Sequence, residues 1–139
     1  MELPPSLIEK NIRRGAILQS YTFEEIGHGK FFVIIGTTAD YVAGLFFINS
    51  NINKSLYGKQ AQLDMQYPLK RADYDFLCYD SFLCATNIIK RPKNYITQSI
   101  QLGKSKFVGD LKENHLNDVL TMVRKSRLFS KAEKDTFFY

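Results

Sequence analysis

The segment from Lys30 to Ser50 constrains the fold more than any other part of the chain. Two runs rich in β-branched and aromatic residues, Phe31 to Ile35 and Tyr41 to Ile48, are too apolar to be solvated on both faces. The residues between them, Gly36 to Asp40, form a polar connection of the length that joins antiparallel neighbours. The sequence therefore predicts a central antiparallel hairpin made of two buried strands.

Weaker patterns predict further strands on both sides of this hairpin. Residues 16–23 alternate well enough to form a first strand, and residues 61–67 and 95–102 alternate between apolar and polar side chains. Residues 76–89 form a second long apolar run, which is interrupted at Asp80 and Ser81. Together these segments predict a small, strongly bent sheet.

Helix signals lie near the two ends of the chain. Residues 6–15 follow two prolines and end at a glycine, so they predict a short helix. An apolar stripe over residues 111–124 predicts a longer helix, and Ser130 with Glu133 has the spacing of a capping box at the start of a last one. We therefore expect one domain over residues 1–139, with an N-terminal helix in 1–14, a partly open barrel in 15–111 and helices in 112–139.

Polar and sulfur-containing side chains interrupt the predicted strand at residues 76–89. On one continuous strand Cys78 and Cys84 would share a face about 20 Å apart, too far for a disulfide bond. We expect two reduced and mostly buried thiols. A carboxylate buried at Asp80 must be paired or hydrogen-bonded, so Asp80 and Ser81 are expected to be structural polar residues.

Several classes of protein are excluded by what the sequence lacks. No apolar run approaches the roughly 20 residues of a membrane span, and the first residues are unlike a secretory signal. We therefore expect a cytoplasmic protein with no membrane partner. No nucleotide-binding, zinc-protease or serine-hydrolase motif is present. His28 and His115 are far apart in the sequence and His115 is expected to be exposed, so we expect no metal site and no cofactor.

The charge of the chain suits an anionic partner such as RNA, and solubility alone explains it as well. The formal net charge is +5, and most of the excess lies after residue 70. Lysines and arginines beside aromatic residues can contact phosphates while the rings stack on bases. The candidate RNA-binding residues are Lys54, Lys90, Arg91 and Lys93, with Lys104 and Lys106 beside Tyr95 and Phe107. The alternative is a solvated basic edge that prevents sheets from pairing.

The order of these elements resembles that of a known family. Gly27-His28-Gly29-Lys30 enters the first hairpin strand and Asn49-Ser50 ends the second, while Asp80-Ser81-Phe82 and Gly109-Asp110-Leu111 follow. Over roughly residues 14–124 this pattern is similar to the MazF/PemK-like family of SH3-like barrels, which are toxins of bacterial toxin–antitoxin pairs. The resemblance implies a mainly β fold, a small SH3-like partly open barrel with peripheral helices.

The resemblance also implies a function, namely cleavage of single-stranded RNA without a metal. It further implies a homodimer neutralised by an antitoxin peptide. His28 would act as acid or base, Lys30 would stabilise charge on the phosphate in place of the family's arginine, and Ser50 would position the phosphate. Lysine cannot reproduce the two-pronged contact of arginine with phosphate. The alternative is therefore a non-catalytic SH3-like barrel that binds RNA or a protein partner.

Overall fold

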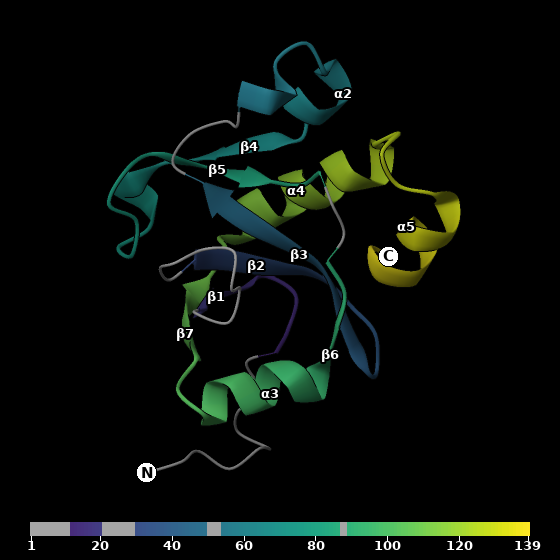
Figure 1. The fold of residues 1–139 in the computed structure, drawn as a ribbon. Helices are drawn as coiled ribbons and strands as arrows, with labels where there is room; N and C mark the ends of the chain where they lie inside the picture. Colours follow the sequence, from purple (N-terminus) through teal and green to yellow (C-terminus); the bar gives the residue numbers. More distant parts are fainter. Residues whose placement is uncertain (1–11, 21–29, 50–53, 87–88) are drawn as a thin grey trace.

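The expected central hairpin is present in the computed structural model, which describes residues 12–20, 30–49, 54–86 and 89–139 (Figure 1). Strand β2 (Lys30–Thr37) pairs antiparallel with β3 (Tyr41–Asn49), and Val33 lies opposite Phe46. Five consecutive residues of β2, from Phe32 to Gly36, are buried. Because neighbouring side chains of a strand point to opposite faces, both faces of this strand are covered.

Five further strands extend the hairpin into an antiparallel sheet among the described residues. Its order is β4-β5-β3-β2-β1-β7, and β6 pairs with the beginning of β3. The outermost strands, β4 and β7, do not pair with each other in the described part of the chain, so the sheet is open. The expected small, mainly β, partly open fold with peripheral helices is confirmed. The added strands are β1 (Ala16–Ser20), β4 (Gln66–Leu69), β5 (Ser81–Cys84), β6 (Arg91–Pro92) and β7 (Ser105–Asp110).

Both outer strands carry features that interrupt a regular strand edge. Pro68 lies within β4 and lacks a backbone N–H. The register between β1 and β7 shifts between Ile17 and Leu18, and Lys106 and Asp110 of β7 are exposed charges. Proline, bulges and charges are the usual protections of sheet edges.

Helices cover the two faces of the sheet. Helix α3 (Lys93–Gln101) places Ile96 against one face, with Leu18 and Phe32. Helices α4 (Glu113–Lys125) and α5 (Lys131–Phe137) cover the other face, where the larger core lies. Figure 1 shows α3 below the sheet and α4 and α5 behind and to the right of β3. The remaining elements are the 3₁₀ turns η1 (Lys54–Leu56) and η2 (Arg71–Asp73) and the short helix α2 (Gln60–Leu63).

The strand expected over residues 95–102 is wrong, because this segment is helix α3. Ile96 is buried and Ile100 is partly buried in the same core, a spacing of four residues that places both on one face of a helix. The helix ends at Gln101, and Gly103, two residues further on, has a φ of +73°, which is favourable only for glycine. The N–H groups of Gly103 and Lys104 donate to the carbonyl oxygens of Ile100 and Ser99. This pair of bonds is a Schellman motif, which satisfies the last carbonyls of the helix.

Two other expected strands are also corrected. Residues 61–67 do not form one strand, because α2 occupies Gln60–Leu63 and β4 begins only at Gln66. The N–H of Asp64 donates to the carbonyl of Gln60, so local hydrogen bonds replace strand pairing there. In the run at 76–89 only Ser81–Cys84 is a strand among the described residues. The expected helix at 6–15 and the end of the strand at 16–23 fall largely outside the described residues.

The two C-terminal helices are confirmed, including the cap of the second. Ser130 Oγ accepts from the N–H of Glu133 at 3.1 Å, and the Glu133 carboxylate accepts from the N–H of Ser130 at 2.8 Å. These reciprocal bonds form the expected capping box of α5.

Replacing Ser130 with alanine is expected to lower the free energy of unfolding by about 1 kcal/mol, because the N–H of Glu133 loses its acceptor. Urea unfolding followed by circular dichroism measures this loss. Ser130→Asp restores an acceptor at the same position and is expected to remain close to the wild type. An alanine variant as stable as the aspartate variant would contradict a contribution from the cap.

Candidate functional site

The face of the sheet under α3 is only partly covered by that helix. Side chains alternate along the strands, so Lys30 lies on the same face as Phe32, and Asn49 on the same face as Phe47. Phe47 pairs with Cys84 of β5, which extends this face away from α3. Lys30, Phe47, Asn49, Gln66 and Cys84 are all half-buried. We call these five residues the Lys30 site.

Lys30 is held in this site by two contacts with β3. Its Nζ donates a hydrogen bond to Oδ1 of Asn49 and lies 5.6 Å from the centre of the Phe47 ring. Burial lowers the pKa of the Lys30 ammonium from its usual value, and negative charge at Cys84 opposes this shift. The site therefore presents a positioned cation beside an aromatic ring.

Hydrogen bonds to sulfur hold the outer part of the site. Nε2 of Gln66 donates to Sγ of Cys84 at 3.2 Å, and Oγ1 of Thr86 lies 3.3 Å from the same sulfur. Cys84 is half-buried, whereas Cys78 is exposed. The expectation of two mostly buried thiols on one strand is therefore wrong for Cys78, because that residue lies in the loop before β5.

The expected site residues do not gather in one place. His28 and Ser50 lie outside the described residues. Lys54 is exposed at the start of η1. Lys90 lies near the opposite end of β3, with its Nζ 4.3 Å from the centre of the Tyr41 ring. Tyr41 and Asn49 are eight residues apart along β3, which corresponds to roughly 26 Å.

The basic group around β6 is therefore separate from the Lys30 site. Arg91 belongs to β6 and its guanidinium carbon lies 6.0 Å from the centre of the Tyr95 ring. Lys93 is the first residue of α3. Lys90, Arg91 and Lys93 thus form a second group of cations at the turn of the central hairpin.

Asp80 and Ser81 differ from the expected buried pair. Asp80 is exposed and lies just before β5, where its Oδ1 accepts from the N–H of Arg71 at 2.9 Å. Its other oxygen lies 3.8 Å from Nζ of Lys70. Ser81 is buried and donates to the carbonyl of Tyr79 at 2.9 Å. The expected burial of Asp80 is wrong because the strand does not continue through residues 76–80.

A polar cluster between β4 and α4 was not expected from the sequence. His115 was expected to be exposed, but it is half-buried and its Nδ1 lies 2.7 Å from the hydroxyl of Tyr74. That hydroxyl also accepts from the N–H of Lys112 at 3.0 Å. Tyr67 donates to Oδ2 of Asp118 at 2.6 Å, and its ring centre lies 5.8 Å from that of His115. The three-residue spacing of His115 and Asp118 on a helix was the only sequence signal for this cluster.

Tyr67→Phe is expected to flatten the alkaline part of the stability profile. Burial, the hydrogen bond to Asp118 and the charge of Asp118 raise the pKa of Tyr67 in the folded state. The folded protein then keeps this proton where the unfolded chain loses it, so the free energy of unfolding falls as the pH rises above about 10. Urea unfolding between pH 8 and 11 measures this dependence. Tyr57→Phe, at an exposed tyrosine, is the control, and equal slopes in both variants would contradict the role of Tyr67.

Among the described residues, no group of three or more His, Cys, Asp or Glu side chains is placed to hold a metal ion. No helix in the described ranges has the length and apolar character needed to cross a membrane. No protein-family model matches the sequence, and no curated protein matches it either.

Proposed function

We propose that this chain is a cytoplasmic, toxin-type RNA-binding protein of a bacterial toxin–antitoxin pair. The observation that carries the proposal is the Lys30 ammonium, held by Asn49 beside the Phe47 ring on a sheet face that α3 only partly covers. The resemblance to MazF/PemK-like toxins supports the same position, since Lys30 follows the Gly27-His28-Gly29 segment. The Lys30 site is therefore the proposed position of the bound RNA.

The chemistry of the Lys30 site fits a single strand of RNA. An ammonium attracts a phosphate, and lysines beside aromatic residues are typical of surfaces that bind single strands. Asn49 Oδ1 accepts one hydrogen bond from Lys30, so the ammonium has further donors to offer to a phosphate. A duplex is a poorer fit, because its bases are stacked on each other and do not reach an aromatic ring.

Cleavage of RNA without a metal is a second candidate function. The observation that favours it is the placement of the Lys30 ammonium, held by Asn49 beside the Phe47 ring, because a positioned cation can stabilise charge that develops on a phosphate. His28 would exchange a proton with the 2′-hydroxyl or the leaving oxygen, and Ser50 would donate a hydrogen bond to the phosphate. Lys30 would stabilise the charge that develops on the phosphate.

The homodimer and the antitoxin peptide enter the proposal through the family resemblance alone. The competing candidate is a barrel without catalytic activity that binds RNA or a protein partner. It is favoured by the lysine at position 30, since a lysine lacks the planar fork with which arginine holds a phosphate.

Incubation of the purified protein with a long, weakly structured RNA and a chelator tests these alternatives. Cleavage should yield discrete fragments that are absent with Lys30→Met and His28→Ala. If the RNA stays intact but shifts on a native gel, RNA binding is supported and cleavage by the free protein is contradicted. If the RNA is neither cleaved nor shifted at high protein concentration, the RNA proposal as a whole is overturned.

A further inference from the structure

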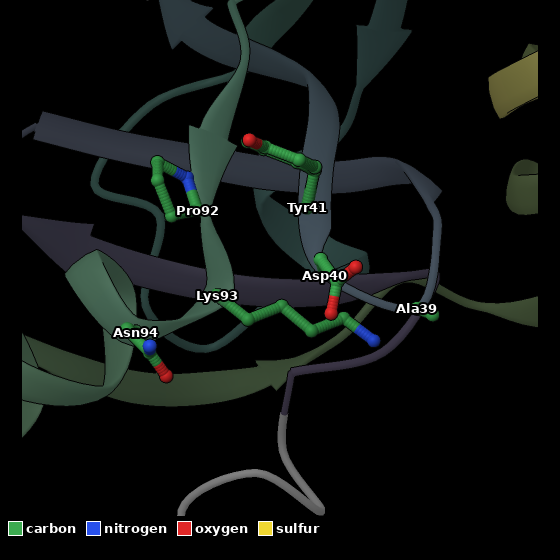
Figure 2. A pocket seen from close by; sticks show the side chains of 6 residues that line it. All are labelled: Ala39, Asp40, Tyr41, Pro92, Lys93 and Asn94. Carbon is green, nitrogen blue, oxygen red and sulfur yellow. The ribbon is translucent and has the colours of Figure 1, made fainter.

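A polar pocket lies at the turn of the central hairpin, far from the Lys30 site. It has a volume of about 700 Å³ and is formed by the hairpin turn and the beginning of α3. This volume falls within the usual range for pockets that hold small ligands. Figure 2 shows the Lys93 side chain extending past Asp40 towards Ala39. The lining residues are Ala39, Asp40, Tyr41, Pro92, Lys93 and Asn94.

Backbone hydrogen bonds hold the two sides of this pocket together. The N–H of Lys93 donates to the carbonyl of Asp40 at 2.9 Å, which fixes the hairpin turn against the start of α3. Within the turn, the N–H of Thr38 donates to the carbonyl of Tyr41 at 2.9 Å, and the N–H of Tyr41 donates to Oγ1 of Thr38 at 3.1 Å. Asp40 and Tyr41 therefore have fixed backbone positions before any ligand binds.

Asp40 is the one carboxylate among the six lining residues, and two lysines lie beside it or beside its neighbour Tyr41. Lys93 lines it, while Lys90 lies over the ring of Tyr41. None of the three ion pairs between described residues involves Asp40, and its side chain is exposed. An exposed carboxylate can exchange its hydrogen bonds with water for hydrogen bonds donated by a ligand.

We propose that this pocket binds a guanine base of single-stranded RNA, an inference that rests on the proposed function. An ionised carboxylate only accepts hydrogen bonds and can accept two at once. Guanine offers two adjacent donors on its pairing edge, the N1–H group and the N2 amino group. Adenine presents an acceptor at N1, and uracil and cytosine each present a donor beside acceptors. Asp40 therefore matches guanine better than the other three bases.

The neighbouring residues suit the rest of a guanosine nucleotide. Tyr41 is 39% exposed, which leaves ring surface for a base to contact. Lys90 and Lys93 supply charge for the flanking phosphates on either side of the base. The pocket would thus select the base, and the lysines would add affinity that does not depend on sequence.

Fluorescence anisotropy with labelled, uridine-rich single-stranded RNA hexamers tests the inference. One hexamer contains a single guanosine, the second has inosine there, which lacks the N2 amino group, and the third has adenosine. Wild-type protein is expected to bind the inosine hexamer about tenfold more weakly than the guanosine hexamer, and the adenosine hexamer at least as weakly. Asp40→Asn is expected to bind all three with similar affinity. Lys93→Met, the matched variant in the same pocket, should weaken all three by a common factor.

The outcomes separate this inference from the proposed function. Equal affinity of the wild type for all three hexamers would overturn the guanine pocket while leaving RNA binding intact. If the protein binds neither the hexamers nor the long RNA, the proposed function itself is overturned. Competition with guanosine monophosphate tests whether the guanine base comes from single-stranded RNA or from a free nucleotide. If the free nucleotide binds through Asp40 and the hexamers do not bind, the pocket serves a nucleotide and the RNA inference is wrong.

Discussion

Lys30→Met is expected to weaken the binding of single-stranded RNA by about 10- to 100-fold. A hydrogen bond to a charged group contributes roughly 1.5–3 kcal/mol, and methionine keeps the length of the side chain without its charge. The slope of log K against log salt concentration should also become shallower by about 0.7, as expected when one phosphate contact is lost. Anisotropy titrations at several salt concentrations measure both quantities.

The matched control for this variant is Lys125→Met. Lys125 is exposed at the end of α4, which packs on the opposite face of the sheet, so the substitution removes the same charge elsewhere. It is expected to change RNA affinity by less than about threefold, because an exposed distant charge is screened. Lys30→Met should fold normally, since it removes a half-buried charge. Equal losses for Lys30→Met and Lys125→Met would show that only net charge matters and would contradict a site at Lys30.

Phe46→Ala is expected to lower the free energy of unfolding by about 3–5 kcal/mol. Phe46 of β3 is fully buried, and its ring centre lies 6.2 Å from those of both Phe129 and Phe138. Alanine would leave a cavity where β3 meets the segment around α5. Since domains are stable by about 5–15 kcal/mol, this is a large share of the total. Urea unfolding followed by circular dichroism measures it.

Two controls accompany this prediction. Tyr57→Ala removes a ring of similar size from an exposed position and should change the free energy of unfolding by less than about 0.5 kcal/mol. Phe46→Leu keeps most of the buried volume and should fall between the wild type and the alanine variant. A loss near 1 kcal/mol for Phe46→Ala would mean that the surrounding aromatic residues collapse into the space.

The elements that could be predicted from the sequence are those with a long apolar pattern or with a motif contained in a few neighbouring residues. The central hairpin carries two apolar runs that no exposed structure can accommodate. Helix α4 repeats its apolar stripe over several turns, and the capping box of α5 is complete within Ser130 to Glu133. These features depend on interactions between residues that are close in the sequence, so they can be recognised without knowledge of the tertiary structure.

Helix α3 could not be predicted because its residues satisfy two periods. Ile96, Ile100 and Leu102 would share one face of a strand, and Ile96 and Ile100 would equally share one side of a helix. Burial of Ile96 against Leu18 and Phe32 decides between them, and that contact joins distant parts of the chain. Gly103 was the one local sign, since a glycine at this point suits the end of a helix.

The candidate site was partly accessible from the sequence. The family resemblance directed attention to Lys30, and the antiparallel hairpin explains why Asn49 is its neighbour. Lys90 and Lys30 lie near opposite ends of β3, so the length of this strand separates them. The positions of the basic residues in the sequence do not reveal this distance. The cluster of Tyr74 and His115 joins residues 41 positions apart, so only the packing of α4 on the sheet brings it together.

The interrupted strands at the two ends of the sheet bear on how copies of this protein meet. Pro68 removes one backbone donor from β4, and the shifted register displaces part of β7 from a straight line. Neither edge offers an uninterrupted ladder of amide groups to an incoming strand. Addition of a strand from another copy to β4 or β7, and with it growth into filaments, is therefore disfavoured.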